Sequence, residues 1–155
     1  LEHRHVVRLE TRPPNLEGER AVNARDLVRN ALRMRPDRII VGEVRGDEVL
    51  DMLQAMNTGH DGSMTTLHAN SLDDALNRLE LLANFAGFSG SEVTLRAQVA
   101  SAIHLMVQVA RLPGGERRVT QVAEVRGTLD SGLDLCSVFR FDPASAAHVD
   151  QRGQS

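Results

Sequence analysis

The stretch RIIVGEVRG, residues 38–46, decides the fold of this chain. Residues 39–41 form an unbroken β-branched run, which is typical of a strand covered by helices on both faces. We therefore predict a buried strand over residues 38–44. A carboxylate, Glu43, follows the run where a parallel strand would end, and ligands of open α/β sheets bind at that edge.

A second strand is predicted at residues 64–68, MTTLH, after a helix at about residues 47–57. Strand, helix and strand in this order are typical of a right-handed βαβ unit, whose strands pair in parallel. Parallel strands bring their C-terminal ends to one edge of a sheet. We therefore predict that Glu43 and His68 open toward one shared cleft, with Arg45 near the same edge.

Caps, apolar spacing and turn residues predict the remaining elements. Helices are expected from Asn23 to just before Pro36, and at about residues 72–85 and 91–102. Strands are expected at residues 5–10, 103–111, 117–126 and 133–141, with Pro113-Gly114-Gly115 joining the middle two as a hairpin. In the helix at 47–57, the side chains expected to face inward are Val49, Leu50, Leu53 and Met56. Residues 144–155 are polar and small, so we expect a disordered tail there.

The composition excludes several kinds of site. All 18 basic residues are arginine, so the chain contains neither a G-x-x-x-x-G-K-[ST] phosphate loop nor a lysine Schiff base. A net charge of −3 and only four aromatic residues give no reason to expect nucleic-acid binding. The single cysteine, Cys136, rules out an internal disulfide and fits a reducing cytosol.

Polar residues around the two predicted strands have the chemistry of a phosphate site. Glu43 could orient an attacking water or sit in the second shell of Mg²⁺, or it could simply form a surface ion pair with Arg45. In NTGHDGSMTTLHAN, residues 57–70, His60 and His68 could hydrogen-bond a γ-phosphate, or could be capped loop residues. Arginines gather before and after the first strand and suit phosphate clamping. Two of them, Arg25 and Arg29, are expected to face solvent or a neighbouring subunit.

Together these motifs resemble a known family. LRMRPDRIIVGEVRG, residues 32–46, followed by GHDGSMTTLHAN, residues 59–70, resembles the Walker B and histidine boxes of type II/IV secretion-system ATPases. The stretch HVVRLETRPPNLEG, residues 5–18, looks like the Flp/Tad pilus assembly ATPases, the CpaF branch related to VirB11. The resemblance runs from about His5 to Phe141.

The resemblance implies a partial RecA-like P-loop NTPase domain over residues 1–143, with a parallel sheet core and a C-terminal antiparallel hairpin. It also implies a hexameric ring that turns over ATP with Mg²⁺ and drives pilus assembly or secretion. The ring would be cytoplasmic, at the inner face of the cell membrane, against platform proteins. By this resemblance Glu43 and His68 are the catalytic residues, and those that contact the nucleotide are Gly42, His60, Arg33, Arg35 and Arg45.

Two alternatives accompany this interpretation. The Walker A loop would lie upstream of Leu1, so the chain is expected to be either a fragment of an active enzyme or a truncated, inactive interaction module of the same family. A zinc hydrolase that uses His60, Asp61, His68 and Glu43 is the other alternative. Seven residues separate the two histidines, which fits poorly with the short ligand spacings of zinc sites.

Overall fold

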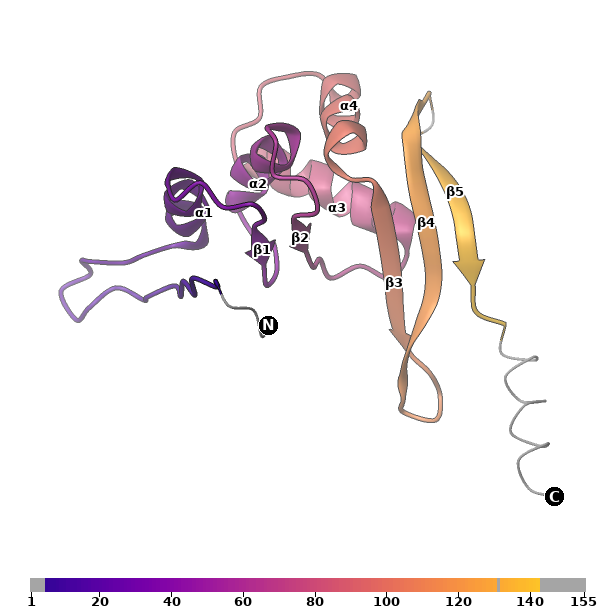
Figure 1. The fold of residues 1–155 in the computed structure, drawn as a ribbon, viewed down its shortest axis with the longest axis horizontal. Helices are drawn as coiled ribbons and strands as arrows, with labels where there is room; N and C mark the ends of the chain where they lie inside the picture. Colours follow the sequence, from indigo (N-terminus) through magenta and orange to yellow (C-terminus); the bar gives the residue numbers. More distant parts are fainter. Residues whose placement is uncertain (1–4, 131, 143–155) are drawn as a thin grey trace. The chain divides into compact units, whose positions relative to one another are not determined.

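The computed structural model describes residues 5–130 and 132–142 (Figure 1). They divide into two compact units. The first unit comprises the described residues up to Leu67 together with Leu79–Gly90, and the second comprises His68–Arg78 and the described residues from Ser91 onward. No helix among the described residues is both long enough and apolar enough to cross a membrane.

The first unit is built on a pair of parallel strands. Strand β1 (Ile40–Val41) pairs in parallel with β2 (Met64–Thr65), and α2 (Glu48–Asn57) connects them. The predicted strand–helix–strand unit and its parallel pairing are therefore confirmed. Both strands are shorter than the predicted 38–44 and 64–68. Within the described part of the chain, β1 and β2 pair only with each other. The outer edge of each strand therefore has no neighbouring strand to extend the pairing.

Burial around β1 differs from the prediction of two covered faces. Ile39 and Val44 are buried, but Ile40 is 42% exposed. Its strand partner Met64 is exposed as well. One face of the parallel pair is therefore open, and the fully buried strand predicted from the β-branched run is wrong at Ile40.

Helix α1 (Ala24–Arg33) begins where its cap residues predict. The Asn23 side chain accepts the backbone N–H of Asp26 at 2.8 Å, and the Asp26 carboxylate accepts the backbone N–H of Asn23 at 3.3 Å. This reciprocal capping box satisfies backbone donors that the first turn would otherwise leave unpaired. The helix ends before Pro36 and packs against α2, with Val28 buried.

The buried face of α2 supplies a large part of the core of the first unit. Val49 and Leu53 are buried as predicted. Leu50 and Met56 are only partly buried, and Met52 and Ala55 are buried in addition. The inward face is thus turned slightly from the one that apolar spacing predicted.

The predicted strand at residues 5–10 is wrong, because this segment has no regular structure. A strand needs a neighbour for its backbone groups, and none pairs with this segment among the described residues. The chain instead forms a loop closed by an isolated antiparallel bridge between Arg12 and Val22. Inside that loop the Asn15 side chain accepts the backbone N–H groups of Glu17 and Glu19.

Helix α3 (Leu72–Phe85) has the predicted bounds. The hydroxyl of Ser71 accepts the backbone N–H of Asp74 at 3.0 Å, as the S-x-x-D pattern predicts. Residues up to Arg78 belong to the second unit, and the remainder of the helix belongs to the first. Its apolar stripe is buried and consists of Leu72, Ala75, Leu76, Leu79, Leu82 and Ala83.

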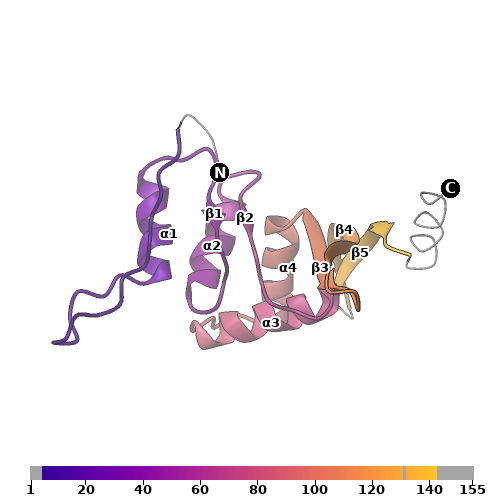
Figure 2. The ribbon, with the colours of Figure 1, turned by 90° about the horizontal axis from the view of Figure 1, so that it is seen from below.

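The second unit is a three-stranded antiparallel sheet with a helix packed on it. The strands are β3 (Leu105–Arg111), β4 (Arg117–Leu129) and β5 (Gly132–Arg140), in that spatial order. The predicted hairpin and the last strand are confirmed. Helix α4 (Glu92–Ala102), capped by Ser91, packs against β4, and the two views agree on this placement (Figures 1 and 2).

Candidate functional site

The backbone on both sides of Glu43 is held by Thr66, the residue directly after β2. The hydroxyl of Thr66 donates to the carbonyl of Gly42 at 2.5 Å, and the N–H of Val44 donates to the carbonyl of Thr66 at 2.9 Å. Glu43 thus lies just past the end of β1, between two residues that are bonded to Thr66. This is the C-terminal edge of the parallel pair, as predicted.

The Glu43 side chain forms the ion pair that was one of the two interpretations of this residue. Its Oε2 lies 2.7 Å from Nε of Arg45. The two side chains are 37% and 69% exposed. An ion pair this open contributes only about 0.2–1 kcal/mol because solvent screens it. A more highly charged cation could therefore replace Arg45 as the partner of the Glu43 carboxylate at little cost in free energy.

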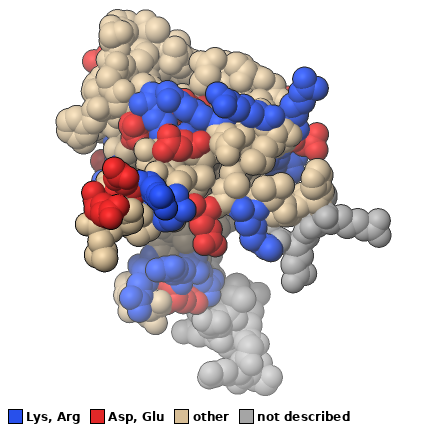
Figure 3. Space-filling view, turned by 90° about the vertical axis from the view of Figure 1, so that its left-hand side faces the viewer, with Lys and Arg blue, Asp and Glu red and all other residues tan. Residues whose placement is uncertain are grey.

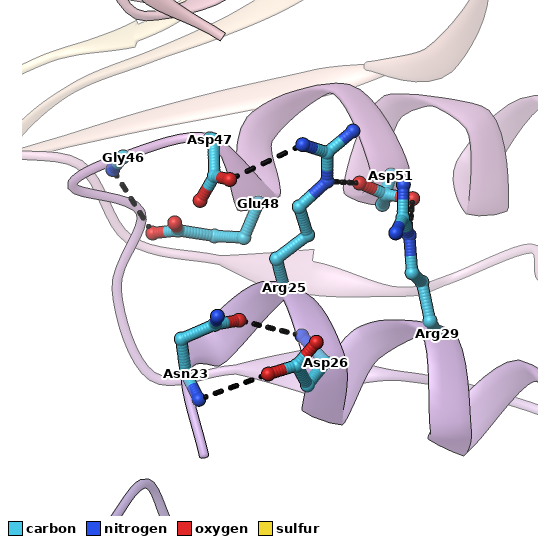
Figure 4. A network of polar contacts seen from close by, with 8 residues as sticks. All are labelled: Asn23, Arg25, Asp26, Arg29, Gly46, Asp47, Glu48 and Asp51. Atoms are coloured by element: carbon cyan, nitrogen blue, oxygen red, sulfur yellow. Dashed lines mark hydrogen bonds and ion pairs between the residues drawn. The ribbon is translucent and has the colours of Figure 1, made fainter. Parts of the chain in front are cut away.

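The turn after Glu43 is fixed by a residue that sequence analysis missed. Glu48 is buried, and its Oε1 accepts the backbone N–H of Arg45 at 2.7 Å. The same oxygen accepts the backbone N–H of Gly46 at 3.1 Å, the contact drawn in Figure 4. An acidic residue in the first turn of a helix is usually read as a solvent-exposed partner of the helix dipole. The sequence does contain one indication of this contact, namely Gly46, two positions before Glu48. A glycine has no Cβ, so a carboxylate can approach the backbone closely beside it.

The histidine-box loop is tied to β1 by a serine. The hydroxyl of Ser63 accepts the backbone N–H of Ile39 at 2.9 Å and donates to the carbonyl of His60 at 2.7 Å. The His60 ring is partly buried, and its Nδ1 lies 3.0 Å from the carbonyl of Ala55, near the end of α2. This contact ties His60 to the end of α2, and its contact with a nucleotide stays a prediction.

Two glycines allow this loop to form. Gly59 and Gly62 have φ values of 90° and 75°, in the left-handed region where a side chain is strained. At Gly62 a Cβ would lie 2.7 Å from Nε of Arg38, so the guanidinium of Arg38 lies directly over this glycine.

His68 is exposed and begins the second unit. The segment after it is tied to β3, because the side-chain amide of Gln108 donates to the carbonyl of Ala69 at 3.3 Å. A longer contact of 3.5 Å reaches the carbonyl of Asn70. Glu43 belongs to the first unit, so the shared cleft of Glu43 and His68 stays a prediction.

The arginines proposed to contact phosphate differ in their surroundings. Arg33 and Arg35 are exposed at the end of α1. Arg35 has a φ of 52°, which is uncommon for a residue with a side chain. Arg45 is held through both its backbone and its guanidinium, as described above.

Arg25 and Arg29, predicted to face solvent or a neighbouring subunit, both pair with a carboxylate of α2, and Arg25 is only partly exposed. Nε of Arg25 lies 2.6 Å from Asp51, and Nε of Arg29 lies 2.8 Å from the other oxygen of the same carboxylate. Arg25 also reaches Asp47 at 3.2 Å (Figure 4). The two arginines are four residues apart, and so are Asp47 and Asp51. Each helix therefore presents two charges of one sign to the other. That matched spacing was visible in the sequence.

Charge and burial act in opposite directions on this network. Burial raises the pKa of Asp51, but the hydrogen bonds from Arg29 and Arg25 outweigh it, and the net pKa lies below its ordinary value. The pKa of Arg25 is raised by its hydrogen bonds to Asp51 and Asp47. On the face drawn in Figure 3, arginines and carboxylates lie interspersed rather than as one field of a single sign.

The described residues offer no ligand set for the zinc hydrolase considered as an alternative. Among residues 5–130 and 132–142, no three His, Cys, Asp or Glu side chains come together in a way that could hold a metal ion. The zinc alternative therefore gains no support from the described residues.

The sequence that forms these features also matches a known family. The features are the parallel strands, the carboxylate at their edge and the histidine loop. Residues 1–142 match the family described as type II/IV secretion system protein. The chain belongs to that family, as its motifs predicted.

Individual relatives agree with this assignment. A Mycobacterium tuberculosis protein named for conjugal transfer is 47% identical over 124 residues, which is 80% of this chain and 35% of that protein. The type IV secretion system protein PtlH of Bordetella pertussis is 45% identical over 108 residues, covering 66% of this chain and 31% of PtlH. The chain thus spans about a third of the length of these relatives.

One solved structure is similar as well. The VirB11 ATPase of the Brucella suis type IV secretion system, solved in complex with sulphate, superimposes with a TM-score of 0.62 and 31% sequence identity. The likeness covers 66% of this chain and 32% of the VirB11 chain.

Proposed function

We propose that this chain is the Walker B and histidine-box portion of an ATPase that couples ATP hydrolysis to pilus assembly or to type II/IV secretion. The observation that carries the proposal is the position of Glu43. The backbone on both sides of it is bonded to Thr66, just past β2, and its carboxylate is partly exposed at the C-terminal edge of a parallel strand pair. Phosphoryl-transfer enzymes place a water-orienting carboxylate at such an edge.

The proposed roles follow from the chemistry of each side chain. The Glu43 carboxylate accepts a hydrogen bond from the attacking water and suits the second shell of Mg²⁺. His68 is the second catalytic residue and would donate a hydrogen bond to the γ-phosphate. The close backbone approach at Gly42 and the residues His60, Arg33, Arg35 and Arg45 complete the proposed nucleotide contacts. Mg²⁺ would neutralise charge that develops on the phosphates.

The side chains present fit only part of a nucleotide. Carboxylate, imidazole and guanidinium groups suit water, Mg²⁺ and phosphate oxygens, but no lysine is available for the β- and γ-phosphates. The chain covers about a third of its relatives' length. We therefore propose that the phosphate-binding loop lies elsewhere in a longer protein. The VirB11 neighbour was solved with sulphate, an anion shaped like phosphate, which supports an anion site in this family.

The larger assembly is proposed from the family. A RecA-like domain, a hexameric ring and a cytoplasmic position at the inner membrane, against platform proteins, are what the resemblance implies. The Flp/Tad branch rests on the HVVRLETRPPNLEG stretch, whereas the relatives described above are named for conjugal transfer and type IV secretion. The second candidate function, an inactive interaction module, is favoured by the missing lysine alone.

Replacing Glu43 by glutamine in the full-length protein tests the proposal. The amide is nearly isosteric, so ATP binding should persist, while the turnover number should fall by about 10²-fold or more because the charge that orients water is lost. Phosphate release and nucleotide binding are measured on the same preparations. Glu116→Gln, in the exposed hairpin turn, is the matched control and should leave both unchanged. An unaltered turnover number in Glu43→Gln would show that Glu43 is only structural.

A further inference from the structure

We infer that Glu48 is a positioning residue, whose buried carboxylate fixes the turn that presents Glu43. The inference rests on the proposed function for its catalytic part, but its structural part is independent of ATP. Within the described ranges, Glu48 is the one charged side chain that is buried, with 5% of the residue exposed. A buried carboxylate is costly unless it is hydrogen-bonded, so its contacts indicate what it stabilises.

Those contacts all lie on the turn between β1 and α2. One oxygen of Glu48 accepts both the Arg45 and the Gly46 backbone N–H groups, and Figure 4 shows the second of these contacts. Hydrogen bonds to an ionised acceptor are about twice as strong as neutral ones. Glu48 is also the first residue of α2, where the helix dipole favours negative charge. The site therefore offers an acceptor-only side chain two backbone donors.

The two bonds complete the anchoring of the backbone after Glu43. The N–H of Val44 is already bonded to Thr66, so Glu48 supplies the acceptors for the next two N–H groups in the chain. With the backbone N–H groups of residues 44–46 bonded, the main chain from which the Glu43 and Arg45 side chains project is held in place. Gly46 fits the same arrangement, because a Cβ there would lie 3.1 Å from Oε2 of Glu48.

Amide hydrogen exchange in this chain tests the structural part. In Glu48→Ala, exchange at Arg45 and Gly46 should speed up by about tenfold or more relative to the Met64 amide on β2, because both N–H groups lose a charged acceptor. Glu48→Gln keeps one oxygen and should give a smaller increase. The matched control, Asp51→Asn, removes a carboxylate from the next turn of the same helix and should leave the ratio unchanged. An unchanged ratio in Glu48→Ala, or equal acceleration of all amides, overturns the inference.

A double-mutant cycle in the full-length protein tests the catalytic part. Glu48→Gln should lower kcat for ATP hydrolysis by about tenfold with little change in KM, because the water-orienting group is misplaced while nucleotide binding is kept. In a Glu43→Gln background the same change should have almost no further effect, because Glu48 acts through Glu43. Independent, multiplying losses would refute the positioning role. A wild-type protein that hydrolyses no ATP would instead refute the proposed function and leave the exchange result to decide the role of Glu48.

Discussion

Arg35 holds a backbone conformation that glycine would adopt at lower cost. Its φ is 52° and it follows the C-cap residue Met34, the position where helices most often carry glycine. A side chain in the left-handed region costs about 1–2 kcal/mol. The arginine therefore lies at a strained position, and such strain often accompanies function.

Arg35→Gly separates stability from binding at this residue. The free energy of unfolding, measured with urea on this chain, should rise by about 0.5–1 kcal/mol because the strain is relieved. ATP affinity of the full-length protein should fall if Arg35 contacts phosphate. The neighbouring change Arg33→Gly, inside the last turn of α1, should instead lower stability by about 1 kcal/mol. A loss of stability in both variants would contradict the assignment of strain to Arg35.

At the scale of elements, α1 and α2 are joined by a carboxylate shared between two arginines. Because the folded-state pKa of Asp51 is lowered, its contribution to stability is present above the ordinary carboxyl pKa of 3.8 and is lost as the pH falls through the lower folded value. Asp51→Asn should therefore destabilise the chain at pH 7, by about 1 kcal/mol after allowance for solvent screening.

Acid titration of the unfolding free energy checks this direction. The difference between wild type and Asp51→Asn should shrink steadily below the ordinary carboxyl pKa. Glu17→Gln, in the exposed loop before α1, serves as a control with no such difference. A gap between wild type and Asp51→Asn that widens on acidification would show that the arginines do not stabilise the folded carboxylate.

The helices were predictable from sequence because their signals are local. Asn23, Ser71 and Ser91 each accept a backbone N–H three residues later, and each helix begins directly after its cap. Strand limits depend on partners that a local pattern cannot specify. This is why residues 5–10 form no strand and only residues 40–41 of the predicted 38–44 form a regular one.

The candidate site was likewise predictable only where its signal is local in the sequence. Glu43 follows from a strand that ends in a carboxylate, but the role of Glu48 depends on a turn whose shape appears only in three dimensions. The cross-helix pairing of Arg25 and Asp51 likewise depends on α1 packing against α2.

At the scale of the whole molecule, we predict that the isolated chain binds ATP weakly and releases no measurable phosphate. Phosphates are normally held by loop amides and a lysine, and the sequence provides neither the loop motif nor any lysine. Phosphate release by the purified chain is compared with that of its Glu43→Gln variant. Steady release above the variant would show that these 155 residues form a complete catalytic site.

The contact between His60 and Ala55 favours one tautomer of the His60 ring, which can be observed by spectroscopy. A carbonyl oxygen can only accept, so Nδ1 of His60 must carry the proton, and the lone pair of the neutral ring lies on Nε2. Nitrogen NMR distinguishes these two tautomers. Loss of this contact would remove the constraint on the tautomer, so the nitrogen signals of the ring would report a rearrangement of the loop between α2 and β2 without a dye or a mutation.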